Sequence, residues 1–468
     1  MGKPSKLQEV IVPRRVWNEK SETMSRERME EVRLEKLKRQ LKGSYERSEF
    51  YQKKFAETGA RPEDIATWED FRKLPVFMNK EDERASEAES REKLGHPFGM
   101  HLCASPEDVL IVRTTTGTTG VPTFGYSYTI GDYERFVEIA SRIFWLASLR
   151  PGDRVLNCFP VLGGIHNSGG LFGQAFINMG VAPLEVGAEA GIERTLQFAM
   201  LTRPTAIIAS PSFADSLIDN CSKITGKEMK ELGIKKLLLS GEPGIEMPSI
   251  RRRIEESFDG KWYVWWALYG ECCGASCGTE EYQGMHEVAP ELAIAAEDLI
   301  DPVTKEPVEV KEGAIGEEVM TALGREGLPF IKYATGDVIQ VFTKPCECGY
   351  PGPGYRFKMV GRVEDMLLVD NIKVFPISLK QVVSSFLPKL TGAMRIVLTE
   401  KPPRITPPLK IRVEYGYGVE EGQLLDLNRE LEARIQAACR ITPSIEFLPP
   451  ESLDRSIWKT PMFAEEYE

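Results

Sequence analysis

The sequence has no apolar run long enough to cross a bilayer. A membrane-spanning helix needs about 20 consecutive apolar residues, and no stretch of the 468 residues approaches that length. The first 42 residues are rich in lysine, arginine and glutamate and lack the apolar segment of a signal peptide. We therefore expect no membrane association and a cytoplasmic location.

An excess of positive charge is also missing. The formal net charge is -11, whereas proteins that bind nucleic acid in general present a strongly basic face. We therefore expect no nucleic-acid partner. The composition, 42% hydrophobic and 28% charged, is that of an ordinary globular protein. The length is sufficient for a large core and more than one domain.

The cysteines do not form an even set of disulfide partners. The chain has nine of them, and an odd number without a secretion signal indicates a reducing compartment. Two groups lie close together in the sequence: Cys272, Cys273 and Cys277, then Cys346 and Cys348. Clustered thiols in such a compartment favour metal binding over disulfides.

Short apolar runs alternate with amphipathic segments between about residues 109 and 320. The predicted buried strands are 109–112, 154–159, 205–209, 236–239 and 262–267. The predicted helices are 132–147, 191–201, 212–221 and 248–258. This alternation predicts an α/β fold with mainly parallel sheets flanked by helices. Ligands of such sheets bind at the carboxyl ends of the strands, where loops 114–120, 240–244 and 269–274 fall.

The pattern changes in the last quarter of the chain. Three short strands and two helices are predicted beyond residue 366, which is about the size of one small α+β domain. We therefore predict a large N-terminal domain at 1–361, with a helical lead-in at 1–60, and a small C-terminal domain at 362–468. The hinge is placed at about 362–365.

The loop Thr114–Gly120 indicates phosphate binding. Its glycines allow close approach of the backbone, successive N–H groups can surround phosphate oxygens, and threonine hydroxyls add donors. A Walker loop would end in Gly-Lys-Ser/Thr, but Val121 and Pro122 follow Gly120. The loop is thus a phosphate site of another type, the alternative being a surface turn.

The loop and the following Pro122-Thr123 resemble the signature of the adenylate-forming superfamily, which includes acyl-CoA synthetases, adenylation domains and luciferases. Four further motifs follow in the order of that superfamily. They are Ser240–Pro243, Tyr269-Gly270, Tyr333–Asp337 and Gly361–Met366. The glycine-rich stretch Gly163–Gly170 and the segment Gly361–Pro376 resemble the phenylacetate–CoA ligase branch most closely.

The resemblance implies roles for single residues. Asp337 would hold the ribose hydroxyls, Tyr269 would stack on adenine, and Arg362 would bind nucleotide oxygens. The resemblance also implies that Lys459, Thr118 and Arg362 are catalytic residues. Glu364 and Asp365 would form the hinge of a mobile C-terminal domain. The implied ATP-binding residues are Thr115, Thr116, Gly117, Thr118, Thr119, Gly120, Ser240, Gly241, Glu242, Pro243, Tyr269, Gly270, Glu271, Asp337 and Arg362. The implied acyl-pocket residues are Gly164, His166, Gly241 and Tyr269.

One motif departs from the superfamily pattern. The superfamily has Tyr-Gly-x-Ser/Thr-Glu, with the glutamate on magnesium, but this chain has Tyr269-Gly270-Glu271-Cys272-Cys273. A thiolate is a poor ligand for a hard cation that prefers oxygen. Glu271 is the remaining candidate for Mg²⁺, with water as the alternative.

Some members of the branch carry a structural zinc, and the cysteines here fit that resemblance. Cys346 and Cys348 flank one residue before a glycine, which is typical of half a zinc knuckle. Cys277 and His286 would complete a closed, structural site. Cys272 or Cys273 is the alternative first ligand, and unmetallated thiols are the alternative to a site.

The function implied is activation of a carboxylic acid by ATP, with Mg²⁺, to an acyl-adenylate, then transfer of the acyl group to coenzyme A. The branch suggests an aromatic or arylacetic acid and a homodimer. Two alternatives stay open: an adenylate-forming enzyme that passes the acyl group to an amine or a carrier protein, and a catalytically degenerate nucleotide-binding regulator.

Overall fold

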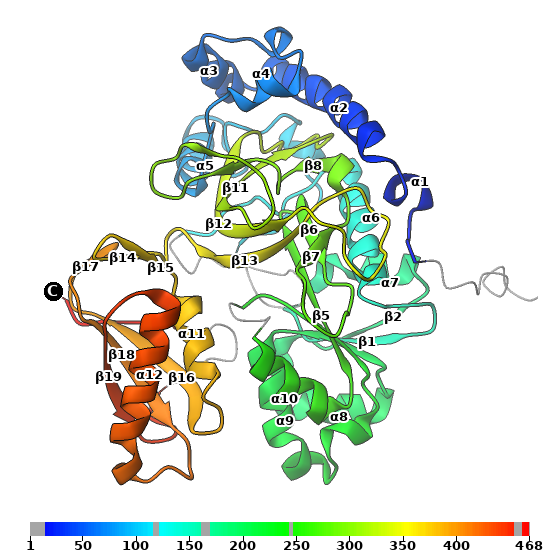
Figure 1. The fold of residues 1–468 in the computed structure, drawn as a ribbon. Coiled ribbons are helices and arrows are strands. Elements are labelled where there is room, and N and C mark those ends of the chain that lie inside the picture. The colour runs from blue at the N-terminus through cyan, green and yellow to red at the C-terminus, as the bar shows by residue number, and fades with distance from the viewer. Residues whose placement is uncertain (1–14, 116–120, 161–168, 243–246, 454–460, 468) are drawn as a thin grey trace, which may run out of the picture.

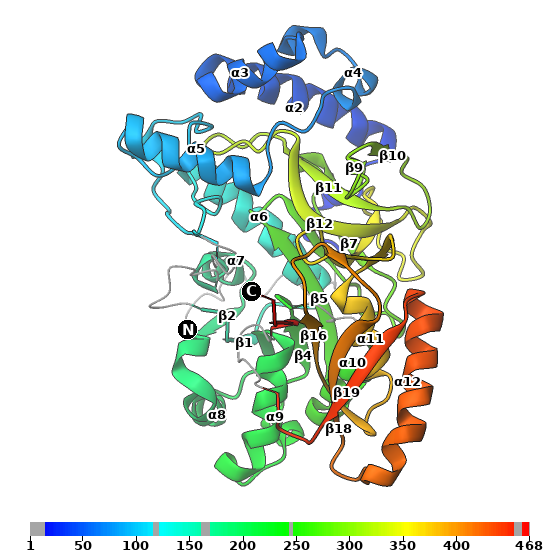
Figure 2. The same cartoon turned by 90° about the vertical axis from the view of Figure 1, so that its left-hand side faces the viewer.

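The computed structural model describes residues 15–115, 121–160, 169–242, 247–453 and 461–467. The N-terminal part contains the helices α1 (Glu19–Glu22), α2 (Arg26–Arg47), α3 (Glu49–Thr58), α4 (Trp68–Arg72) and α5 (Lys80–Lys93). The predicted helical lead-in at 1–60 is divided into separate helices, and α2 ends before α3 because Ser48 has extended backbone (φ −133°, ψ 120°). Helices α2, α3 and α4 form one end of the molecule (Figures 1 and 2).

A 13-stranded mixed sheet forms the centre of the fold. Its parallel part consists of β1 (Arg154–Asn157), β2 (Ala182–Glu185), β3 (Ala206–Ala209), β4 (Lys236–Leu239) and β5 (Lys261–Leu268). Its antiparallel part consists of β6 (Cys272–Ala275), β7 (Met285–Glu287), β8 (Ala293–Ile294), β9 (Leu299–Ile300), β10 (Pro307–Val308), β11 (Ile315–Ala322), β12 (Tyr333–Phe342) and β13 (Arg356–Arg362).

The α/β class is confirmed, but the expectation of mainly parallel sheets holds only for β1–β5. Three residues join β5 to β6, and a parallel connection needs a crossover of a dozen or more residues. Antiparallel pairing is therefore obligatory at this point. The strand predicted at 109–112 is absent, since only Ile111 pairs, with Tyr128, and Leu110 and Val112 are exposed.

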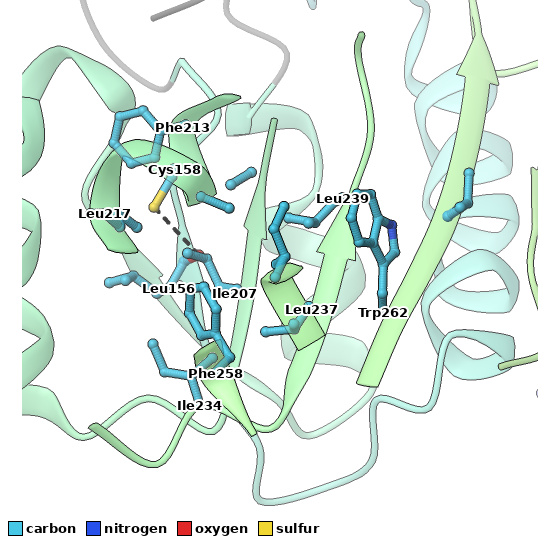
Figure 3. Packing of buried hydrophobic residues seen from close by; sticks show 14 of the residues in the cluster. Leu156, Cys158, Ile207, Phe213, Leu217, Ile234, Leu237, Leu239, Phe258 and Trp262 are labelled. Atoms are coloured by element: carbon cyan, nitrogen blue, oxygen red, sulfur yellow. Dashed lines mark hydrogen bonds between the residues drawn. The ribbon is translucent and has the colours of Figure 1, made fainter. Parts of the chain in front are cut away.

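Helices cover both faces of the parallel strands. Helices α8 (Gly191–Thr202), α9 (Pro211–Thr225) and α10 (Pro248–Phe258) pack on one face; α6 (Ile130–Leu146) and α7 (Gly173–Asn178) pack on the other. Ile207 faces the first set and Ile208 the second, as alternation along a strand requires. Figure 3 shows Ile207 and Leu237 packed with Phe258. Burial on both faces explains the continuous apolar runs in the sequence.

The last hundred residues have a hydrophobic core of their own. They form α11 (Pro376–Ser384), α12 (Leu424–Cys439), a three-stranded sheet and a four-stranded sheet. The smaller sheet is β14 (Leu367–Val369), β15 (Ile372–Val374) and β17 (Arg404–Ile405). The larger sheet is β16 (Leu390–Leu398), β18 (Leu409–Tyr415), β19 (Pro443–Leu448) and β20 (Phe463–Glu465). This part lies beside α10 in Figure 1.

A small apolar cluster joins the C-terminal part to the large sheet. Phe375 and Ile377 pack with Met247 and Val338, and Lys373 Nζ lies 2.8 Å from Asp301 Oδ2. Among the described helices, none is both long and apolar enough to span a membrane.

Candidate active site

The two ends of the Thr/Gly loop are held together by threonines. The backbone N–H of Thr115 donates to Thr123 O at 2.9 Å, and that of Thr123 donates to Thr115 Oγ1 at 3.1 Å. Residues 116–120, with the predicted site residues Thr116, Gly117, Thr118, Thr119 and Gly120, lie outside the described residues. The fold thus brings both entrances of the predicted phosphate loop to one point.

Lys80 connects this point to the second motif. Its Nζ donates to Thr123 Oγ1 and to Tyr269 OH, and lies 3.1 Å from Glu83 Oε2. The three donors of the ammonium group therefore all have partners. Lys80 begins α5, whose first turn is capped by the Asn79 side chain, which accepts from the N–H groups of Glu81 and Asp82. The cap fixes the start of the helix and hence the position of Lys80.

Glu83 lies one turn further along α5 and is fully buried. It accepts hydrogen bonds from Tyr269 OH at 3.0 Å and from Tyr333 OH at 2.8 Å, besides that from Lys80. Burial by itself would raise the pKa of Glu83, but the charge of Lys80 and the bond from Tyr333 hold it below its ordinary value. Lys80 and the fully buried Glu83 therefore form an ion pair beside Thr123.

Tyr269 does not have the free aromatic face that stacking on adenine requires. Its ring is 1% exposed and stacks on Phe330, with centroids 4.7 Å apart and planes at 17°. A Cβ added to Gly125 would lie 2.5 Å from the ring, so only glycine permits that backbone to pass. These neighbours enclose the ring in this structure, and the stacking of Tyr269 on adenine stays a prediction.

Glu271 is not placed to hold magnesium. Both oxygens accept from the Arg135 guanidinium at 2.5 Å, and Arg325 Nη1 lies 3.5 Å from Oε1. A carboxylate in a bidentate pair with one arginine and next to a second has its charge already compensated. These contacts do not support Glu271 as a magnesium ligand, and that role stays a prediction. Cys273, at the position of the superfamily's glutamate, is buried in the core.

The loop after β4 lies at the carboxyl end of the parallel strands, as predicted. Ser240 Oγ donates to Trp265 O at 2.6 Å, and Glu242 accepts from Ser212 Oγ at 2.7 Å. Burial raises the pKa of Glu242 above its ordinary value. Gly241 is exposed, with φ at +91°. Pro243 and the predicted acyl-pocket residues Gly164 and His166 lie outside the described residues.

Asp337 and Arg362 face each other across β12 and β13. Arg362 Nε lies 3.6 Å from Asp337 Oδ1 and 3.1 Å from Glu364 Oε1. The Asp337 charge, with Glu364 and Asp365, raises the pKa of Arg362 above its ordinary value. The structure thus places the predicted ribose-binding aspartate, the predicted arginine and the predicted hinge residues side by side.

Glu87 gives the site a measurable pH dependence. It lies one turn after Glu83 and accepts from the Phe124 N–H at 2.7 Å. Burial, and then the charge of Glu83, raise the pKa of Glu87 to about 8. A carboxyl whose pKa is raised on folding stabilises the fold when protonated, and that stability is lost as pH rises from the unfolded value towards 8.

We expect Glu87→Gln to remove this pH dependence, because the amide stays neutral at every pH. Relative to the unmodified chain, the variant should gain roughly 4 kcal/mol of unfolding free energy at pH 8 but only about 1 kcal/mol at pH 5. Urea unfolding at both pH values measures the difference. An equal effect of the substitution at both pH values would contradict the raised pKa.

A second cluster lies about the antiparallel strands. Cys277 follows β6, His286 is on β7, and Cys346 and Cys348 lie in the loop between β12 and β13. The sulfur and ring-nitrogen atoms of the four all lie within 4.8 Å of one another. Cys277 Sγ is 3.8 Å from Cys346 Sγ, and Cys348 Sγ is 3.4 Å from His286 Nε2.

These distances fit tetrahedral zinc. Thiolates bound at about 2.3 Å in a tetrahedron lie about 3.8 Å apart, and a thiolate and an imidazole about 3.6 Å apart. Tyr350 N–H donates to Cys348 Sγ at 3.3 Å, and Gly349 N–H donates to Cys346 O at 3.2 Å. Such a turn orients both sulfurs towards one point. Of the alternative first ligands, Cys273 lies in the hydrophobic core instead.

No protein-family model matches this chain. A curated phenylacetate-coenzyme A ligase from Thermus thermophilus is 29% identical over 461 residues, which cover 93% of this chain and 96% of that protein. The chain is thus similar to phenylacetate–CoA ligases over nearly its whole length. Its resemblance to that branch was visible in the motifs and is confirmed over nearly the whole length.

Solved structures of 2-hydroxyisobutyryl-CoA ligase have the same fold as this chain. One, in the postadenylation state in complex with 2-HIB-AMP, has a TM-score of 0.84 at 24% identity and covers 98% of this chain and 94% of its own. Another, in complex with 2-HIB-AMP and CoA in the thioesterification state, covers the same shares with a TM-score of 0.68 at 24% identity. The overall arrangement is therefore closer to the first.

Sequence reasoning missed the residues that support the site. Lys80, Glu83, Arg135 and Arg325 lie in segments with ordinary charged composition, and nothing nearby indicated that they were buried. Only the capping pattern at Asn79 was a local signal, and it indicates a helix start and no more. The site's supporting charges depend on partners distant in the sequence.

Proposed function

We propose that this chain is an AMP-forming acid–thiol ligase that activates an aromatic or arylacetic acid and transfers it to coenzyme A. The observation that carries the proposal is the near end-to-end match to a curated phenylacetate-coenzyme A ligase. The Asp337–Arg362 pair and the clamped Thr/Gly loop support it, because they supply nucleotide-binding groups within the right fold. Fold alone would not carry an activity.

Two half-reactions follow from this proposal. The carboxylate attacks the α-phosphorus of ATP, the bond to the β-phosphate oxygen breaks, and pyrophosphate leaves. The thiol of coenzyme A then attacks the acyl carbon and AMP leaves. Donors directed at the developing negative charge lower the barrier of the first step. We assign the stabilisation of this charge to loop 115–120, including Thr118, and to Lys459. Residues 116–120 and Lys459 lie outside the described residues.

The remaining assignments concern binding. Asp337 accepts the ribose hydroxyls, because charge-assisted hydrogen bonds are short and directional, and Arg362 meets nucleotide oxygens. Mg²⁺ would be held by ATP oxygens and water, since Glu271 is bound to two arginines. Gly241, exposed at the end of β4, borders the acyl group together with Gly164 and His166.

We further propose that residues 362–468 turn as a unit about Glu364 and Asp365 between the two half-reactions. Two states of 2-hydroxyisobutyryl-CoA ligase support this rotation. This chain matches the postadenylation state with a TM-score of 0.84 and the thioesterification state with a TM-score of 0.68, although both are the same enzyme. Arg362 contacts Glu364 at 3.1 Å, so rotation at that residue would alter the pair that holds the nucleotide. Domain closure of this kind gates many enzymes.

Three smaller proposals complete the assignment. Zn²⁺ binds Cys277, His286, Cys346 and Cys348 in a closed, structural site. The chain is a homodimer, which sedimentation equilibrium tests directly. Its location is cytoplasmic, which cell fractionation tests.

The function is tested with the full chain, ATP, Mg²⁺ and a panel of carboxylic acids. Acid-dependent exchange of pyrophosphate into ATP and release of AMP are expected, highest with arylacetic or aromatic acids. Thioester formation should require coenzyme A. If no acid supports exchange, the chain is a nucleotide-binding regulator. If exchange occurs but the acyl group passes to an amine or a carrier protein, the chain is an adenylate-forming enzyme with that acceptor instead of coenzyme A.

Asp337→Asn should raise the KM for ATP by about 10- to 100-fold, because one charged hydrogen-bond acceptor is lost. The KM for the acid should change little. Steady-state AMP release at varied ATP measures this. Asp259→Asn is the control, since Asp259 pairs with Lys235 at the exposed end of β4. A normal KM for ATP in Asp337→Asn would contradict the ribose assignment.

A further inference from the structure

A cavity of about 390 Å³ lies between α2 and the main body of the protein. Helix α2 forms one wall, and residues from α6 and from the segment after β11 form the other. Its volume lies in the range of small-molecule sites, about 300 to 1,000 Å³. The lining residues that matter for its chemistry are Lys36, Arg39, Arg47, Arg135, Arg325 and Glu326.

The cavity has an excess of positive charge. Five cationic side chains line it and only one carboxylate, that of Glu326. Lys36 donates to the backbone oxygen of Glu291 at 2.9 Å. Across the described part of the chain, Lys36, Arg39 and Arg47 have no ion-pair partner. Most exposed cations are simply solvated, but three around one cavity reinforce one another.

The inner wall adds two buried guanidinium groups. Arg135 and Arg325 are both bound to one carboxylate, Glu271, so two positive charges share one negative charge. The Nε atom of each is buried and has no hydrogen-bond partner among the described residues. A buried donor without an acceptor destabilises the fold, and a bound anion that accepts the hydrogen bond would remove that cost.

The titration of Lys36 agrees with this distribution of charge. Burial lowers the pKa of Lys36 to about 8. The charge of Glu291 opposes this shift, and the guanidinium groups of Arg135, Arg142 and Arg39 add to it. Cations that repel one another in this way lose part of that repulsion when an anion binds between them.

We propose that this cavity is a second anion-binding site, separate from the adenylation site, for a small molecule with two or more phosphate groups. The two exposed arginines would meet the anion first, and Lys36, Arg135 and Arg325 would surround it. Several cations in a cleft with low-dielectric walls favour a polyanion over a monoanion, because each added charge meets another unpaired cation.

Arg325 links the cavity to the nucleotide motif that begins at Tyr269. Arg325 donates to the backbone oxygens of Tyr269, Gly125 and Ser127. An anion that draws Arg325 towards the cavity would therefore act on the turn that carries Tyr269. The proposal itself concerns binding and does not depend on the reaction that the adenylation site performs.

Isothermal titration of the full chain tests the proposal, with the adenylation site saturated by α,β-methylene-ATP and Mg²⁺. Three probes are compared: adenosine 3′,5′-bisphosphate, pyrophosphate and inorganic phosphate. Either of the first two should bind once per chain, and inorganic phosphate more weakly. The double variant Arg39→Glu/Arg47→Glu should weaken that binding at least about tenfold, since contacts to charged groups are reversed. Lys36→Met should weaken it as well.

The matched control is Lys38→Glu/Lys42→Glu, which changes the same number of charges on exposed positions of α2 outside the cavity. Retained binding in the control and loss in the cavity variants support the site, and the preferred probe identifies the class of polyphosphate. Equal loss in the control would show general surface attraction and overturn the proposal. Binding that is unchanged in the cavity variants, or undetectable in the unmodified chain, would also overturn it.

Discussion

The Cys346→Ser variant should lose zinc and much of its stability. The unmodified chain is expected to hold one zinc ion per chain, bound by the four residues whose ligand atoms lie within 4.8 Å of one another. Two of them lie on the segment between β12 and β13 and two near β6 and β7, so the ion would join four strands of the large sheet. Metal bound only by the folded state stabilises that state by its full binding free energy.

The expected loss is on the order of 5 kcal/mol of unfolding free energy, since structural zinc binds with about 10 kcal/mol or more and three ligands retain part of that. Elemental analysis gives the metal content, and urea unfolding gives the free energy. Treatment of the unmodified chain with a chelator should cause a similar loss of stability.

Two other cysteine variants serve as controls for the zinc assignment. Cys273→Ser should keep its zinc, because Cys273 lies in the core among aromatic and aliphatic side chains and not in the cluster. Cys439→Ser, on α12 in the C-terminal part, should keep it too. A full complement of zinc in Cys346→Ser, or none in the unmodified chain, would disprove the structural zinc site.

The second large effect is expected from the buried pair beneath the Thr/Gly loop. Glu83→Leu leaves the Lys80 ammonium without its carboxylate in a site where Glu83 itself is fully buried. Removing one partner of a buried pair typically costs about 3–5 kcal/mol, because the other charge stays desolvated. Equilibrium unfolding measures this cost.

The double variant Lys80→Met/Glu83→Leu should recover most of the lost stability, since no unpaired charge remains. Activity should not recover. Lys80 joins Thr123, at one end of the loop, to Tyr269, and methionine cannot donate those bonds. We expect adenylate formation to fall about tenfold or more, with the KM for ATP raised.

An exposed pair on the same helix provides the control. Lys93 Nζ lies 2.6 Å from Glu89 Oε1 on α5, but both side chains are about half exposed. Glu89→Leu should cost less than about 1 kcal/mol and leave adenylate formation unchanged, because solvent screens such pairs. If Glu83→Leu were as mild as Glu89→Leu, the assignment of a buried ion pair would fail. If the double variant were fully active, Lys80 would not be a positioning residue.

The sequence determined the elements that local chemistry controls. Strands β1, β3, β4 and β5 lie where the apolar runs predicted them. Helix α6 precedes β1, and α8, α9 and α10 lie between the strands, as buried parallel strands and covering helices require. The motif order also determined the superfamily, because each motif uses residue types suited to a nucleotide. The spacing of Cys346 and Cys348 indicated half of a zinc site, and the resemblance to the branch supplied Cys277 and His286.

Tertiary structure alone decided which charges are buried and with what partners. Lys80 lies 189 positions from Tyr269, and Glu83 lies 250 positions from Tyr333, so no local pattern connects them. Glu271 could have been a magnesium ligand by its sequence, but Arg135, 136 positions away, is bound to it. The Thr/Gly loop, the Cys346/Cys348 pair and the parallel strands follow from residue type and spacing. The ion pairs around them do not, because the cost of burying a charge depends on groups that only the folded chain brings together.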